Sequence, residues 1–228
     1  MFSKLRGIFV LIQFSLTVAV VITLMYAFPK YGVAIRKFWM KIQIPLLGIK
    51  METQGTCDPD AQLLLMNHQA LLDIVVIEFL DHRDIAWVAK KEIAQLFFFG
   101  HILKAPKMII VDRQNKAGLI KLIKDVKDRI SHNRPIAMFP EGTRSDGTKL
   151  LKFKTGAKLI AQKHNLKVQP ILLFDTRKVL DSKTLNATPG VVKVIYLDSI
   201  DPRDDKEWFE NMETAMNERF YKELNHDI

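Results

Sequence analysis

The stretch AQLLLMNHQALLD, residues 61–73, contains the order of elements that decides the fold. Its first part, Ala61–Met66, is a short apolar run typical of a buried strand. A helical pattern follows over Leu71–Leu80, and His68 lies in the short polar loop between the two. A strand that passes through such a loop into a helix is the basic unit of an α/β fold.

The alternation of strand and helix continues along the chain. Further buried-strand patterns lie at Ile85–Val88, Met108–Val111, Ile136–Phe139, Val168–Leu173 and Val191–Leu197. Further helical patterns lie at Lys116–Ile130, at Thr155–His164 and from about Asp204 to Leu224. The last helix carries one apolar stripe, which predicts packing against the core. We therefore expect an α/β fold with a mixed, largely parallel sheet flanked by helices.

His68 and Asp73 lie five positions apart at the first of these strand ends. In a regular helix that spacing separates two side chains by about 140°, so they would not meet. They would meet if His68 lies in the loop and Asp73 points back from the first helical turn. Asp73 would then fix the imidazole tautomer and leave the other ring nitrogen as a base. A surface histidine near an unrelated carboxylate is the alternative.

A second strand end reads IAMFPEGTRS, residues 136–145. Gly142 allows unusual backbone dihedrals and the close approach of a ligand. Arg144 offers a forked guanidinium suited to two phosphate oxygens. The alternative is a Glu141–Arg144 pair on an exposed turn. At a third strand end, Asp112 and Arg113 follow Met108–Val111, with several lysines nearby.

The amino end differs in composition from the rest. Residues 8–28 carry no charge, and their length predicts a transmembrane helix over about this range. A cleaved signal peptide is the alternative, but its apolar core is usually shorter. Residues 31–49 mix apolar and basic side chains, which indicates an interfacial amphipathic helix. We expect a membrane anchor over residues 1–50, a catalytic domain over 51–228, and, from the basic flanks, a cytoplasmic position for that domain.

Charge and missing motifs exclude several classes of protein. The 228 residues include 34 Lys and Arg against 25 Asp and Glu, a net charge of +9 that favours anionic partners. The single cysteine excludes an internal disulfide framework and a Cys-rich zinc site. The sequence has no G-x-S-x-G elbow, Walker loop or G-x-G-x-x-G. A histidine and an acid without a nucleophile suggest that the hydroxyl of the substrate is the attacking group.

Four motifs in order carry a resemblance to a known family. They are Asn67-His68-x4-Asp73, the Arg113 segment, Phe139-Pro-Glu-Gly-Thr-Arg-Ser145 and Val168-Gln-Pro170. Together they resemble the glycerolipid acyltransferase family, and within it most closely the bacterial 1-acyl-sn-glycerol-3-phosphate acyltransferases. One departure is visible, because the second motif usually begins with glycine where this chain has Lys107.

The resemblance implies a reaction and a role for each matching residue. An acyl chain would pass from a thioester, acyl-CoA or acyl-carrier protein, to the free hydroxyl of lysophosphatidic acid. His68 would be the base and Asp73 its orienting partner, while backbone N–H groups near the His68 turn would stabilise the oxyanion. The glycerol phosphate would be held by Lys90, Arg113, Glu141, Gly142, Thr143 and Arg144. Pro170 would help to shape the acyl site.

The same resemblance implies no cofactor and no metal. It places the enzyme in the bacterial inner membrane, in contact with anionic lipids and not with nucleic acid. An acyltransferase acting on glycerol 3-phosphate or on another lysophospholipid is the alternative within the family. A non-enzymatic membrane-surface protein is the alternative outside it. The run Leu96–Phe99 would either line the acyl site or belong to the core.

Overall fold

A computed structural model describes residues 2–112 and 115–226. Its main sheet has seven strands in the order β1-β9-β6-β2-β5-β3-β4. The strand bounds are β1 Ile49–Gln54, β2 Leu63–Met66, β3 Ala86–Lys90, β4 Ile109–Val111, β5 Ile136–Met138, β6 Val168–Phe174 and β9 Gly190–Tyr196. Neighbouring strands pair in parallel except β6 with β9, which are antiparallel. The expected mixed, largely parallel sheet is confirmed.

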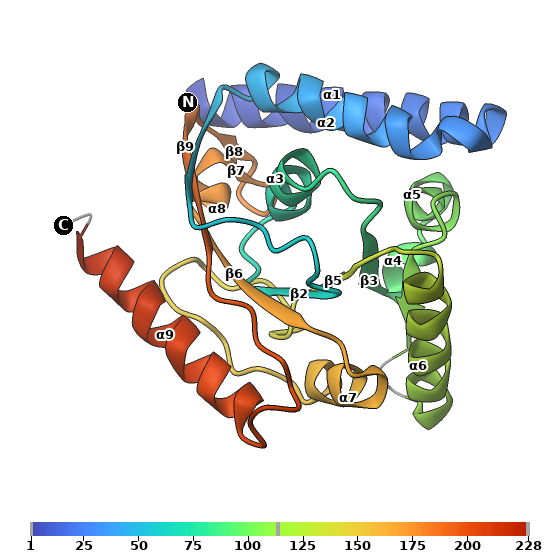
Figure 1. Cartoon of the computed structure of the whole chain (residues 1–228). Helices are drawn as coiled ribbons and strands as arrows, with labels where there is room; N and C mark the ends of the chain where they lie inside the picture. The colour runs from blue at the N-terminus through green and yellow to red at the C-terminus, as the bar shows by residue number, and fades with distance from the viewer. Residues whose placement is uncertain (1, 113–114, 227–228) are drawn as a thin grey trace.

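Helices cover both faces of this sheet (Figure 1). The longer ones are α1 Phe2–Ala27, α2 Gly32–Leu46, α3 Leu72–Leu80, α6 Lys116–Ser131, α7 Gly156–His164 and α9 Trp208–His226. The short ones are η1 Pro29–Tyr31, α4 Lys91–Ala94, η2 Phe98–Gly100, α5 His101–Lys104 and α8 Thr176–Val179. A separate small hairpin pairs β7 Leu180–Asp181 with β8 Asn186–Ala187. One core contains buried side chains of α1, α2 and α3, and the other contains those of α6, α7 and α9.

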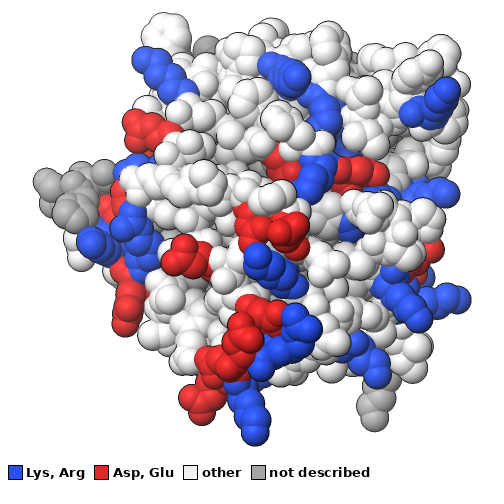
Figure 2. Space-filling view, viewed as in Figure 1, with Lys and Arg blue, Asp and Glu red and all other residues white. Residues whose placement is uncertain are grey.

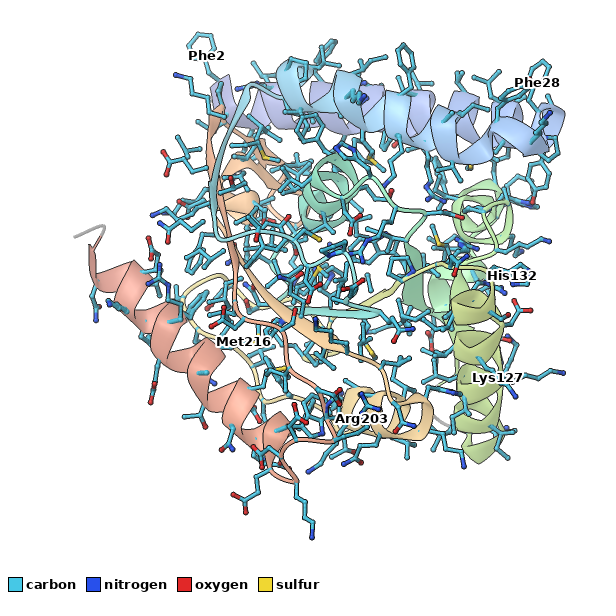
Figure 3. All side chains as sticks on the ribbon, in the orientation of Figure 1. Phe2, Phe28, Lys127, His132, Arg203 and Met216 are labelled. Atoms are coloured by element: carbon cyan, nitrogen blue, oxygen red, sulfur yellow. The ribbon has the colours of Figure 1, made fainter. Side chains whose placement is uncertain are left out.

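The stripe on α9 packs into the second core as expected. Trp208, Met212, Met216 and Phe220 are all at most 1% exposed. Met216 lies on the side of α9 that faces the sheet (Figure 3). The spacing of four residues predicts this burial because it keeps the apolar side chains on one face of the helix.

Strand β1 was not expected from the sequence. The amphipathic helix predicted to reach residue 49 ends at Leu46, and Ile49–Gln54 pairs along its whole length with β9. Only its first residue is buried, so the segment lacks the apolar alternation that identifies a strand. Its place at the edge of the sheet depends on pairing with β9, which is distant in the sequence.

A buried ionic network joins α2 to α3 and β3. The Glu78 carboxylate accepts from Lys37 Nζ at 2.6 Å and from Trp87 Nε1 at 2.9 Å, and it lies 3.5 Å from Arg36 Nη2. Arg36 is 2% exposed and Glu78 1% exposed. Arg36 also binds Asp84 at 2.9 Å. The network therefore fixes the apolar N-terminal helices to the helix that carries Asp73.

Removal of Glu78 tests that network. Glu78→Ala leaves Arg36 and Lys37 without their shared partner, so the free energy of unfolding should fall by about 3–5 kcal/mol. Glu210→Ala is the control, because Glu210 forms an exposed pair with Lys158 and should cost less than about 1 kcal/mol. Denaturant unfolding in detergent measures both variants. Equal losses would show that the Glu78 network does not hold the helices.

Candidate active site

His68 and Asp73 meet at the carboxyl end of β2. His68 lies in the loop after the strand, Asp73 lies in the first turn of α3, and His68 Nδ1 is 2.6 Å from Asp73 Oδ2. Asp73 Oδ2 also accepts the backbone N–H groups of Gln69 at 2.7 Å and Ala70 at 2.9 Å. The loop position expected from the spacing is confirmed. Because donors surround the carboxylate, the imidazole donates from Nδ1, and in the neutral ring Nε2 is then the nitrogen that carries the lone pair.

Thr176 also binds the Asp73 carboxylate, a contact that the sequence did not predict. Its Oγ1 donates to Asp73 Oδ1, and both side chains are 0% exposed. Thr176 begins α8, directly after β6, and β6 pairs with β2 in the sheet. A hydroxyl 103 positions away carries no local signal, since only the order of strands brings it to Asp73.

Phe139 covers one face of the imidazole. The two ring centroids lie 3.8 Å apart and the rings are 10° from parallel. Trp87 lies behind Phe139 at 5.5 Å. The His68 side chain keeps 14% exposure. The stacking, together with the bond to Asp73, fixes the orientation of the ring before any substrate arrives.

Glu141 holds the two motif loops together. Its carboxylate accepts the backbone N–H of His68 at 2.7 Å and that of Leu151 at 2.8 Å. In return the His68 carbonyl accepts the N–H of Ser145 at 2.8 Å. Burial raises the pKa of Glu141 to about 7, against the lowering effect of the two N–H donors, and the charge of Asp73 adds to the rise.

Comparison with known proteins identifies the family of this chain. A family model described as Acyltransferase matches residues 49–173. A 1-acyl-sn-glycerol-3-phosphate acyltransferase of Helicobacter pylori is 40% identical over 79% of this chain and 78% of its own length. The chain belongs to the acyltransferase family. Another relative, a lyso-ornithine lipid O-acyltransferase of Rhizobium meliloti, is 31% identical over 52% of this chain and 40% of its own.

The fold is shared with a solved member of the family. The crystal structure of the 1-acyl-sn-glycerophosphate acyltransferase of Thermotoga maritima matches with a TM-score of 0.75. The match covers 98% of this chain and 95% of that one, at 22% identity. This enzyme of the acyltransferase family therefore has the fold that the sequence predicted.

Two arginines of this acyltransferase lie beside the loop that carries His68. Arg144 Nη1 donates to Ser182 Oγ at 3.3 Å, and Arg144 and Arg177 line a small hollow beside Gln69 and Ala70. Among the described residues no carboxylate pairs with Arg144, so the alternative of a Glu141–Arg144 turn pair is wrong.

The remaining expected site residues are more dispersed. Lys90 ends β3, Thr143 is exposed, and Pro170 lies buried in β6 opposite Leu65. Gly142 takes a left-handed φ of 72°, as its loop requires. Arg113 lies outside the described residues. Glu141 binds backbone groups, whereas the resemblance implied that it contacts the substrate.

The backbone conformation of Lys107 shows why glycine is usual at this position of the second motif. Its φ is 53°, in the left-handed region that glycine adopts without steric cost. Its carbonyl accepts from Arg129 Nε at 2.7 Å, which helps to hold this backbone. The departure from the family motif thus changes the side chain at a position whose backbone keeps a glycine-like conformation.

Two expectations about the surroundings of the dyad become more specific. The N–H groups of residues 68–70 bind Glu141 and Asp73, so the expected oxyanion donors would have to be other N–H groups near this turn. Leu96–Phe99 is not core, because Phe97 is 97% exposed. A cavity of about 670 Å³ does open beside Phe139 and Gly142, between α6 and α7.

The burial of Glu141 predicts how stability depends on pH. Its folded pKa of about 7 exceeds the ordinary value of 4.5, so the folded protein binds the proton more tightly than the unfolded chain. The stabilisation is complete below pH 4.5 and is lost as the pH rises through 7. Between these limits the free energy of unfolding should fall by about 3 kcal/mol more in the wild type than in Glu141→Gln. Denaturant unfolding at a series of pH values measures this difference.

Glu218→Gln is the matched control, because Glu218 is exposed on α9. It should keep the wild-type dependence on pH. A Glu141→Gln protein with the same pH dependence as the wild type would show that Glu141 is ionised throughout this range.

Proposed function

We propose that this acyltransferase moves a fatty acyl chain from a thioester to the sn-2 hydroxyl of 1-acyl-glycerol-3-phosphate, giving phosphatidic acid. The observation that carries the proposal is the contact of His68 with a carboxylate already surrounded by donors, which leaves Nε2 free to accept a proton. The names of the relatives support the choice of acceptor. Acyl-CoA and acyl-carrier protein are both suitable donors.

In this reaction the acceptor hydroxyl attacks the thioester, and His68 moves the proton as general base and then as general acid. Nε2 of His68 takes the proton of the acceptor hydroxyl while its oxygen attacks the thioester carbonyl. The tetrahedral intermediate then collapses, the C–S bond breaks, and the imidazolium returns the proton to the departing thiolate. Such general base catalysis contributes roughly 10²–10⁴-fold. Asp73 stabilises the transient imidazolium and, with Thr176 and Phe139, keeps the ring in place. No metal or cofactor is required by this route.

Phosphate recognition is the proposed task of the basic residues. Arg144 is free of carboxylate partners among the described residues and shares its hollow with Arg177. Lys90 and Arg113 are assigned to the same phosphate by the family motifs. Glycerol 3-phosphate or another lysophospholipid is the alternative acceptor, and the relative named for lyso-ornithine lipid shows that the family includes other acceptors.

The apolar N-terminal helices are the proposed membrane anchor. Among the described residues, α1 is the one helix long and apolar enough to cross a membrane. Both of its ends contact the catalytic domain, through Ser3 with Asn186 at 3.2 Å and Tyr26 with His101 at 2.7 Å. We therefore favour a helix that lies along the domain with its outer side in one leaflet, in place of the transmembrane helix expected over residues 8–28. In this proposal the anchor is residues 1–50 and the catalytic domain is 51–228.

The basic charge of the N-terminal helices supports their binding to an anionic leaflet. We infer that this is the cytoplasmic leaflet of a bacterial inner membrane. The first acidic residue of the chain is Glu52, so α1 and α2 carry only basic charges. The upper edge in Figure 2, over these helices, is largely white with separate blue side chains. An apolar surface flanked by basic groups alone is attracted to anionic lipids.

Loss of the base tests the reaction. His68→Ala should lower kcat by at least about 100-fold, and Asp73→Asn should be severe but milder because the imidazole remains. His132→Ala is the control, since His132 is exposed at the far end of α6 (Figure 3). Acyl transfer to lysophosphatidic acid is measured, with circular dichroism to check folding. A folded His68→Ala enzyme with near wild-type turnover would refute the mechanism.

A change at Arg144 tests the acceptor. Arg144→Lys keeps the charge but loses the paired donors, and a charge-assisted hydrogen bond contributes roughly 1.5–3 kcal/mol. We expect kcat/KM to fall about 10- to 150-fold for a phosphorylated acceptor and much less for an unphosphorylated one. Arg203→Lys is the control on an exposed loop (Figure 3). An unchanged ratio between the two acceptors would exclude a phosphate-selecting role for Arg144.

A further inference from the structure

We propose that residues 93–99, here called the aromatic lobe, form a second membrane-inserting element that holds the active-site face of the enzyme against the lipid. The lobe reads IAQLFFF. Its apolar side chains are exposed to an unusual degree: Ile93 43%, Leu96 55%, Phe97 97%, Phe98 37% and Phe99 43%. A contiguous exposed apolar segment of this kind marks an interaction surface.

The lobe is a closed turn held by its own backbone. The N–H of Gly100 donates to the carbonyls of Leu96 at 2.9 Å and Phe97 at 3.1 Å, and the N–H of Leu96 donates to Ile93. A Cβ at Gly100 would lie 2.3 Å from the Ala94 carbonyl oxygen, so only glycine permits this closure. The turn therefore presents Phe97 outward in a defined position.

The lobe adjoins the carboxyl end of α1. Phe98 lies 6.4 Å from the His101 ring, and His101 Nδ1 lies 2.7 Å from the Tyr26 hydroxyl. Both η2 and α5 contact α1, and Figure 1 shows α5 below that end of the helix. Phe28 and Tyr31, just beyond α1, are 53% and 58% exposed. The lobe thus continues the apolar surface proposed to lie in the membrane.

Charge favours lipid over a protein partner. Residues 93–111 contain no acidic residue, while Lys104 and Lys107 are exposed beside the lobe. Basic groups next to an apolar tip suit an anionic lipid surface. Lys104 and Lys107 would also attract an acidic carrier protein, but the uncharged tip formed by residues 93–99 offers such a protein no ion pair, whereas a lipid surface accepts the whole apolar tip.

The position of the lobe gives it a role in substrate access. It lies in the segment between β3 and β4, and Val88 of β3 and Val111 of β4 line the cavity beside Phe139. Insertion of the lobe would bring this edge of the sheet to the membrane, where a lipid acceptor resides. This link to catalysis rests on the proposed function, whereas insertion itself does not.

Lipid quenching measures insertion directly. Phe97→Cys, in a Cys57→Ser background of the full chain, is labelled with an environment-sensitive fluorophore and reconstituted into vesicles of zwitterionic and anionic lipids. Lipids with a nitroxide on the acyl chain should quench this label strongly. Ile120→Cys is the matched control, because Ile120 is 71% exposed near the start of α6. Equal, weak quenching at both positions would overturn the proposal.

Activity provides an independent measurement. Phe97→Ser should raise KM about 10-fold for an acceptor presented in vesicles, the change expected for losing one inserted phenylalanine. It should leave kcat/KM for a soluble short-chain acceptor unchanged, and Ile120→Ser should change neither. If wild type lacks the activity, the proposed function fails while the quenching result still decides insertion. A label at position 97 that responds to acyl-carrier protein and not to vesicles would instead identify a protein-docking site.

Discussion

The buried carboxylate of Asp73 is the constraint on which the active site depends. A carboxylate with no exposure must find donors within the protein, and here it accepts from two backbone N–H groups, from Thr176 and from the His68 ring. These contacts close the loop after β2 and fix the first turn of α3. The same requirement that stabilises a buried charge therefore orients the imidazole.

The order of strands brings the parts of the site together. Strand β2 lies between β5 and β6, so the loops that follow these three parallel strands meet at one edge of the sheet. Glu141 then binds the loop after β5 to the His68 backbone. A reaction that needs a fixed base and a bound anion is served by loops whose positions are set by a rigid sheet.

The apolar N-terminal helices are connected to the active site by direct side-chain contacts. Glu78 on α3 pairs with Arg36 and Lys37 of α2, and it also binds the indole of Trp87. That indole lies against Phe139, the ring that covers His68. A continuous set of contacts therefore runs from the proposed membrane surface to the base, and the surface that meets lipid has a defined position relative to the chemistry.

The sequence by itself determined the strands of the parallel core, the loop position of His68 and the contact with Asp73, because burial periodicity and short spacings are local properties. Tertiary structure alone decided the rest. Thr176 reaches Asp73 only through the pairing of β6 with β2, and β1 is a strand only because β9 lies beside it. Whether Phe97 faces core or solvent depends on a turn closed at Gly100, which composition does not encode. Each of these outcomes needs a partner distant in sequence or a specific backbone path, and a local pattern records neither.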